Sequence, residues 1–352
     1  MSDFEKLGEF GLIARFQSRL KHRSRRVRLG IGDDAAVYSP RLGWHQVAST
    51  DALVETVHFR TDTTPPERLG EKAIAVNVSD IAAMGGVPLV ALVSLGLPAS
   101  TPLKFIDGMM KGFEKASADY GIELAGGDTV ASPRHLFINV TLVGEVRKSR
   151  YFTRAGARPG DTLMVTGSLG DAALGLALLG KRRQPLQGGT KHKNFLCRRH
   201  QAPTARVREA ALLARSRARV GAMIDISDGL VQDLSHLLES GGLGARLWED
   251  ALPHSTALRR ICAANRLNPL SFSLSGGEDY ELLFTLAPVD VKKITRQFQK
   301  ANALATPIGE VTANGGQVSL LRSSGRLEPL PRALGYDHFK PASPKHSGGS
   351  KI

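Results

Sequence analysis

The sequence predicts a mixed α/β chain of two domains, α/β (α+β) in class. With 352 residues, the chain is longer than a single hydrophobic core usually organises. Apolar runs of strand length alternate with amphipathic helical segments, which is the pattern of α/β units. A hydrophobic content of 42% is enough to fill two cores and excludes a disordered chain. We place the domains at residues 1–150 and 151–340, with a disordered Pro/Ser/Gly/Lys-rich tail at 341–352.

The first domain is predicted to contain a small mixed sheet of about four strands and two crossing helices. An amphipathic helix is expected at residues 10–20, and a turn that leads into a strand at 30–37. A helix over 67–84 is opened by a Pro-Pro pair and ended by a Gly-Gly pair. The other expected elements are a strand that ends at 49–51, a strand over 87–97, a helix over 102–120, and strands over 122–125 and 136–146.

The second domain is predicted to continue the alternation of strands and helices. Strands are expected at residues 162–166, 222–226 and 281–286, and helices at 169–179, 228–240 and 289–301. Residues 180–204 are basic, glycine-bearing and weakly periodic, so we expect a long loop there.

The chain carries a formal charge of +14, concentrated at residues 21–28 and 181–199. Such runs are typical of a nucleic-acid-binding surface or of a solvated face that attracts anionic substrates. The runs lack interleaved aromatic residues, and they match no nucleic-acid-binding module, so we favour the solvated face. A basic nucleic-acid-binding protein stays open as an alternative of a different class.

Three features predict a cytoplasmic protein with no membrane partner. The longest apolar stretch, residues 87–97, is about half the length that spans a bilayer. The N-terminus lacks the basic and apolar regions of a signal peptide. Cys197 and Cys262 form no CxxC pair, which excludes a cysteine zinc cluster and argues against a disulfide framework.

Aspartates at chain turns are the most informative feature. Flanked by small residues that let a ligand approach, they stand at the ends of predicted strands or the starts of turns: Asp33, Asp34, Asp51, Asp128, Asp225 and Asp228. Asp80 lies on a predicted helix, one turn from Asn77 on the same face. Turn chemistry or helix capping would explain any one of them, and Asp228 could be a helix N-cap. Together they predict a cluster whose repulsion cations must neutralise, and carboxylate oxygens suit Mg²⁺.

Several common catalytic motifs are missing from the sequence. It has no P-loop, protein-kinase glycine loop, nucleophile elbow or HExxH zinc motif, and its ten histidines show no metal-ligand spacing. We therefore expect a magnesium-dependent enzyme that holds the phosphates of ATP through carboxylate-bound metal ions.

Seven short motifs follow one another along the chain, after a Gly-Glu-Phe at its start: residues 30–36, 49–51, 77–85, 126–129, 225–230, 275–282 and 335–339. In combination and order, from about Gly8 to Phe339, they resemble the thiamine-monophosphate kinase family. Single pieces such as Gly-Gly-Asp-Thr recur across the wider superfamily of aminoimidazole-ribonucleotide synthetase.

The resemblance implies a two-domain aminoimidazole-ribonucleotide synthetase-like fold. Its N-terminal small mixed sheet pairs with a copy of itself in a homodimer, and a C-terminal α/β domain follows. ATP and several Mg²⁺ ions are implied between the domains, with in-line transfer of the γ-phosphoryl group to thiamine monophosphate, which gives thiamine diphosphate. The acceptor phosphate has a second pKa of about 6, so no general base is expected. Another ATP-using enzyme of the same superfamily stays open as an alternative.

The resemblance also implies roles for individual residues. The implied metal ligands are Asp34, Ser49, Thr50, Asp51, Asp80, Asp128, Asp225 and Asp228, of which Asp51, Asp80 and Asp128 are expected to be essential. The implied nucleotide contacts are Gly127, Asp128, Arg150 and Ser227, and the implied contacts to the thiamine moiety are His58, Glu278 and Tyr336. Tyr336 stands where the family often has Trp, and it can still stack on a cationic ring. Neither Asp33 nor the basic stretch at 181–199 is given a role.

Overall fold

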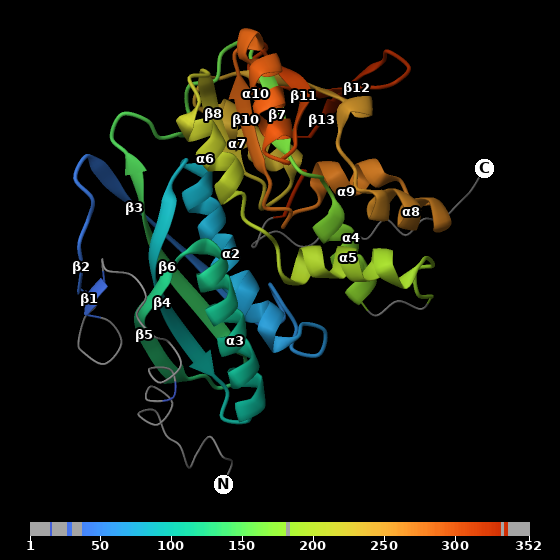
Figure 1. Ribbon diagram of the computed structural model, residues 1–352. Coiled ribbons are helices and arrows are strands. Elements are labelled where there is room, and N and C mark those ends of the chain that lie inside the picture. The colour runs from blue at the N-terminus through green and yellow to red at the C-terminus, as the bar shows by residue number, and fades with distance from the viewer. Residues whose placement is uncertain (1–14, 16–26, 30–36, 181–183, 332–333, 337–352) are drawn as a thin grey trace.

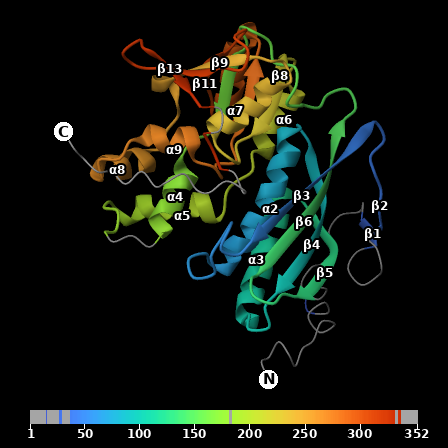
Figure 2. The same cartoon turned by 180° about the vertical axis from the view of Figure 1, so that it is seen from behind.

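The computed structural model describes residues 15, 27–29, 37–180, 184–331 and 334–336 (Figure 1). Of the helix expected at 10–20, only Arg15 is described, and it is helical. The acids Asp33 and Asp34 and the tail at 341–352 lie outside the described residues. Figures 1 and 2 show two α/β units, with helix α2 (Pro66–Ala83) on the side of the first unit that faces the second. No helix in the described part of the chain combines the length and the apolar character that a membrane crossing needs.

The first unit contains a mixed four-stranded sheet. Its strands are ordered β3 (Trp44–Val54), β6 (Phe137–Arg147), β4 (Val87–Leu97) and β5 (Glu123–Ala131). β6 runs antiparallel to both of its neighbours, and β5 runs parallel to β4. Helices α2 and α3 (Leu103–Tyr120) lie on one face of this sheet, and a short pair, β1 (Val27–Leu29) with β2 (Val37–Tyr38), forms a separate ribbon.

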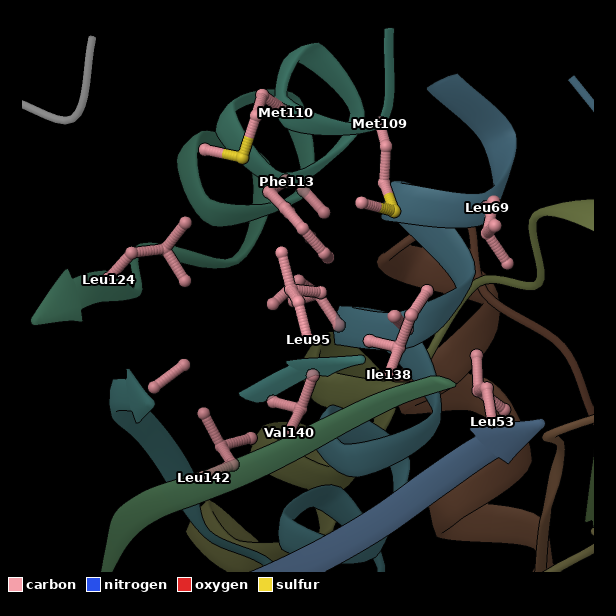
Figure 3. Close-up of a cluster of buried hydrophobic side chains, with 14 of the residues drawn as sticks. Leu53, Leu69, Leu95, Met109, Met110, Phe113, Leu124, Ile138, Val140 and Leu142 are labelled. Carbon is pink, nitrogen blue, oxygen red and sulfur yellow. The ribbon is translucent and has the colours of Figure 1, made fainter. Parts of the chain in front are cut away.

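Alternate strand residues fill the core between the sheet and the two helices (Figure 3). Leu53, Ile138 and Leu95 point inward from three strands and meet Met109 and Phe113 of α3. Side chains alternate between the two faces along a strand. Ser49 and Asp51 therefore share the inward face of β3 with Leu53, whereas Thr50 points to the outer face.

The second unit is built on a seven-stranded sheet. The strand order is β13 (Leu327–Leu330), β12 (Val318–Leu321), β9 (Gly244–Trp248), β11 (Ala305–Thr312), β7 (Thr162–Thr166), β10 (Leu282–Leu286) and β8 (Val220–Asp225). Helices α6 (Val207–Arg215) and α10 (Pro288–Lys300) bury one face, and α7 (Leu230–Glu239) buries the other. A further helical group contains α4 (Asp171–Leu179), α5 (Thr190–Gln201), α8 (Thr256–Ala264) and α9 (Pro269–Ser275). Ala82 and Ala83 at the end of α2 pack into the core beside α6, which joins the two units.

Most predicted helices and strands are confirmed within two residues at each end, but three predictions were wrong. β3 continues to Val54 and β5 to Ala131, because their pairing with β6 and β4 continues, so Asp51 and Asp128 lie inside strands. The loop expected at 180–204 contains helix α5, which packs against α4. Helices α6, α8 and α9 and strands β9, β11, β12 and β13 were not predicted.

Candidate active site

Strand β3 and helix α2 bring the first acids together. Ser49 Oγ donates a hydrogen bond to the Asp80 carboxylate. One turn earlier on α2, the fully buried Asn77 accepts the backbone N–H of Asp51 on its Oδ1 at 3.0 Å. The helix is therefore tied to the strand where Ser49 and Asp51 point inward.

Strand β8 adds a third carboxylate from the second unit. Asp225 ends β8 and is 4% exposed, and its Oδ2 accepts a hydrogen bond from Ser79 Oγ at 2.7 Å. Asp51, Asp80 and Asp225 thus form one cluster at the junction of the two units, which we call the carboxylate cluster.

Burial and mutual repulsion disfavour the ionised forms of this cluster. Burial raises the pKa of Asp51, and the charges of Asp80 and Asp225 raise it further. Burial followed by the charge of Asp80 likewise raises the pKa of Asp225. Burial also raises the pKa of Asp80, although Ser49 and Arg154 act in the opposite direction. Such shifts identify a place where added positive charge is favourable.

The donor atoms of the carboxylate cluster fit Mg²⁺. Three carboxylates and the Ser49 hydroxyl are hard oxygen ligands. Among the described residues, no group of three or more His, Cys, Asp or Glu side chains is arranged to hold a metal ion without other ligands. Mg²⁺ does not require such a group, because it commonly keeps water and takes substrate phosphates beside one or two carboxylates. Asp34, another of the expected metal ligands, lies outside the described residues.

Asp233 on α7 is a further acid of the site that the sequence did not reveal. Its Oδ2 accepts the backbone N–H groups of Ser227 at 3.0 Å, Asp228 at 3.1 Å and Gly229 at 3.1 Å. Burial, with repulsion from Asp225 and Asp228, raises the pKa of Asp233 to about 8. Asp233 therefore binds the loop that presents Ser227 and Asp228 to the first turn of α7, and the N-cap of that helix is Gly229 rather than Asp228. The place of Asp233 in the first helical turn was the available signal.

Two of the expected thiamine contacts are linked through Lys72 of α2. Lys72 Nζ donates to the backbone oxygen of His58 at 3.1 Å and to Glu278 Oε1 at 2.5 Å. His200 Nδ1 lies 2.6 Å from Glu278 Oε2. His58 Nδ1 accepts the N–H of Val54 at 3.0 Å, which fixes the ring.

Tyr336 lies beside the loop that contains Ser227 and Asp228. Its N–H donates to the backbone oxygen of Asp228 at 3.1 Å, and its own oxygen accepts from Gln232 at 2.8 Å. The residue as a whole is 47% exposed. Glu278 meets the same loop, because its N–H donates to the Ser227 oxygen at 2.7 Å.

Three expected site residues lie away from the carboxylate cluster. On the outer face of the first sheet, Thr50 Oγ1 lies 3.0 Å from Asn139 Oδ1. Asp128 is exposed on β5, and because β3 and β5 are the opposite edges of the sheet, three strand spacings of about 4.8 Å separate it from Thr50. Arg150 donates to the backbone oxygen of Ala218 at 2.7 Å. Within the described residues, no hydrogen bond or ion pair joins these three to the cluster.

Comparison with known proteins identifies two domain families along the chain. Residues 32–146 match the family described as AIR synthase related protein, N-terminal domain, and residues 158–321 match its C-terminal domain.

Full-length relatives are also found. Thiamine-monophosphate kinase of Bacillus subtilis (strain 168) is 34% identical over 334 residues, covering 95% of this chain and 100% of that protein. The enzyme of the same name from Escherichia coli (strain K12) is 37% identical over 337 residues, covering 94% and 98%. A solved structure of AaThiL complexed with AMPPCP and TMP is 35% identical, covers 96% of this chain and 99% of that chain, and has a TM-score of 0.72.

Proposed function

The chain belongs to the thiamine-monophosphate kinase family, and from this membership we propose how its residues transfer a phosphoryl group from ATP to thiamine monophosphate. The enzyme is an ATP-dependent kinase whose acceptor is itself a phosphate group. The observation that supports our assignment of the reaction centre is the carboxylate cluster of Asp51, Asp80 and Asp225, which joins the two units.

We assign the metal-holding role first to the carboxylate cluster with Ser49, and then to Asp34 and Asp228. Thr50 and Asp128, which the motifs also imply, lie on the outer face of the first sheet, so any metal that they hold is separate from the cluster. Bound Mg²⁺ supplies positive charge that lets two anionic phosphates approach each other. The protein's part is orientation, because β3, α2 and β8 fix the acids relative to one another. No side chain is assigned as a general base, since a phosphomonoester with a second pKa of about 6 is already largely ionised at neutral pH. Direct in-line transfer of the γ-phosphoryl group follows as the proposed reaction.

The acceptor and nucleotide contacts are assigned by position. His58 receives a backbone N–H on Nδ1, so its ring proton is on Nε2, where it can donate to the acceptor. The Glu278 carboxylate and the ring of Tyr336 suit a cationic thiazolium. Among the nucleotide contacts, which are Gly127, Asp128, Arg150 and Ser227, Ser227 is the nearest to the carboxylate cluster along the chain. Arg150 would have to exchange its bond to the Ala218 oxygen for a phosphate.

A homodimer is the proposed assembly. The outer face of the first sheet exposes Leu92 at 36% and Val130 at 54%, and β3 and β5 are edge strands within the described part of the chain. Exposed strand edges and apolar side chains are commonly covered in native proteins. A second copy that covers this face would also lie over Thr50 and Asp128. A monomeric mass in light scattering at micromolar concentration would contradict the dimer.

A cytoplasmic location is proposed because Cys197 and Cys262 are both free thiols, as a reducing compartment keeps them. Periplasmic activity in cell fractions would contradict it.

Product analysis tests the reaction. The protein is incubated with Mg²⁺, thiamine monophosphate and ATP labelled in the γ-phosphate. We expect ADP and labelled thiamine diphosphate in equal amounts, and no transfer to free thiamine. Formation of AMP, or phosphorylation of free thiamine with none of its monophosphate, would reject the proposal.

A further inference from the structure

Lys72 is a lysine whose side chain is only 1% exposed. Lysines are rarely buried to this degree unless they are paired. It projects from α2 of the first unit and reaches the loop at 275–282 of the second. Its ammonium group donates at 3.1 Å to the oxygen of His58 and at 2.5 Å to Oε1 of Glu278. A single charged group therefore joins two residues that lie 220 positions apart in the sequence.

Glu278 is held from further directions as well. His200 Nδ1, on a side chain that is 6% exposed, lies 2.6 Å from Glu278 Oε2, a contact that is an ion pair only when the imidazole is protonated. The backbone N–H of Glu278 is bound to the Ser227 oxygen. Burial alone would raise the pKa of Glu278, but Lys72 and His200 outweigh it and lower the pKa to about 2.

Two observations make stability a poor explanation for this arrangement. Lys72 loses its hydration and Glu278, whose side chain is 23% exposed, loses most of it, and such an ion pair is often no more stable than an apolar pair of similar size. Glu278 also has a φ of 66°, in the left-handed region that non-glycine residues adopt at an energetic cost. Such strain concentrates at functional sites, where the surrounding structure maintains it.

We propose that Lys72 is a positioning residue for thiamine monophosphate: it fixes His58 relative to Glu278, while His200 fixes the second oxygen of the carboxylate. This inference rests on the proposed function, in which His58 and Glu278 contact the acceptor.

The position of Lys72 predicts a selective effect. Lys72 and Asp80 are eight residues apart on α2, which corresponds to about 12 Å along the helix axis. A change at Lys72 therefore disturbs the acceptor contacts and spares the carboxylate cluster. A purely structural role would instead lower the amount of folded enzyme and leave both KM values unchanged.

The test compares Lys72→Met with Lys115→Met, in the full-length protein with both substrates varied. Lys115 is an exposed lysine on α3 that pairs with Glu71 at 3.1 Å and Asp119 at 2.6 Å. Lys72→Met should raise the KM for thiamine monophosphate about tenfold or more, and keep the KM for ATP within about threefold. Lys115→Met should change neither value.

His200→Gln provides a second variant, because it removes the imidazole and leaves the Lys72–Glu278 pair in place. It should raise the acceptor KM by a smaller factor, again without a change in the KM for ATP. An unchanged acceptor KM in folded Lys72→Met, or an equal rise in both KM values, overturns the inference. If Lys72→Met does not fold, an unchanged acceptor KM in His200→Gln overturns it. A parent enzyme that does not phosphorylate thiamine monophosphate would instead reject the proposed function.

Discussion

The carboxylate of Asp233 accepts the backbone N–H of Asp228 at 3.1 Å, and the same oxygen also receives the N–H groups of Ser227 and Gly229. Asp233 is 2% exposed, so these hydrogen bonds form away from bulk water. One oxygen of Asp233 accepts all three N–H groups, which it can do in either protonation state. The conformation of the loop that presents Ser227 and Asp228 is therefore set by a side chain outside the loop.

Replacing Asp233 by alanine should destabilise the protein and the loop together. Asp233→Ala leaves up to three N–H groups without their acceptor, so we expect a loss of about 2–4 kcal/mol in unfolding free energy. Asp233→Asn keeps an amide oxygen and should lose less. Glu239→Ala on the same helix, with a side chain 77% exposed, should change stability by less than about 0.5 kcal/mol. Urea denaturation measures all three, and a loss no larger for Asp233→Ala than for Glu239→Ala would show that Asp233 does not stabilise the loop.

Asp80 should be essential for turnover and dispensable for folding. Asp80→Asn keeps the shape of the side chain and removes its charge, so we expect a roughly thousandfold lower kcat at saturating ATP. The variant is assayed over a magnesium titration, with circular dichroism to verify folding. Asp119→Asn, a matched change at a residue on α3 whose side chain is 56% exposed, should retain full activity. A folded Asp80→Asn enzyme within about tenfold of the parent would show that Asp80 is not required.

Local sequence rules predicted the part of the site that depends on one element at a time. Helical spacing placed Asn77 and Asp80 on one face of α2, and both contact β3 there. The two-residue period of a strand could also have shown that Thr50 and Asp51 point to opposite faces. The motif resemblance implies both as metal ligands, and the strand period means that they do not hold the same ion.

Contacts between distant segments could not be predicted in this way. Helix α5 lies in a basic, weakly periodic stretch, and its position depends on tertiary contacts. A Cβ on Gly175 of α4 would lie 2.1 Å from the backbone oxygen of Leu196 on α5. The two helices therefore pack so closely here that only a glycine fits. Arg199 Nη2 lies 2.8 Å from Oε1 of the fully buried Glu281. Part of the basic stretch therefore neutralises a buried acid, whereas the sequence predicted a solvated surface there.

Gly127 should tolerate no side chain, because β5 approaches β4 closely at this point. Its φ is 156°, and an added Cβ would lie 1.8 Å from the Val93 oxygen. Gly127→Ala should therefore cost at least about 2 kcal/mol in unfolding free energy and separate Asp128 from its place on β5. Gly121, the left-handed cap of α3, has no atom within 4 Å of an added Cβ, so Gly121→Ala should cost only about 1 kcal/mol. If Gly127→Ala and Gly121→Ala lose the same unfolding free energy in urea denaturation, the contact with Val93 does not exclude a side chain at position 127.

The Lys72–Glu278 pair should make stability depend on pH in the acid range. The pKa of Glu278 is lowered to about 2, below the value of an unfolded glutamate. The ionised carboxylate is therefore favoured in the folded state, and this pH-dependent contribution is present above about pH 4.5 and is lost as pH falls toward 2. In Lys72→Met the main charge that opposes burial is gone, so the pKa should rise and this acid-range loss should shrink. Unfolding free energies of the parent and of Lys72→Met at pH 2.5, 3.5, 4.5 and 6 would measure this loss of stability. Lys115→Met is expected to follow the curve of the parent. Parallel curves for the parent and Lys72→Met would mean that Lys72 does not control the charge of Glu278.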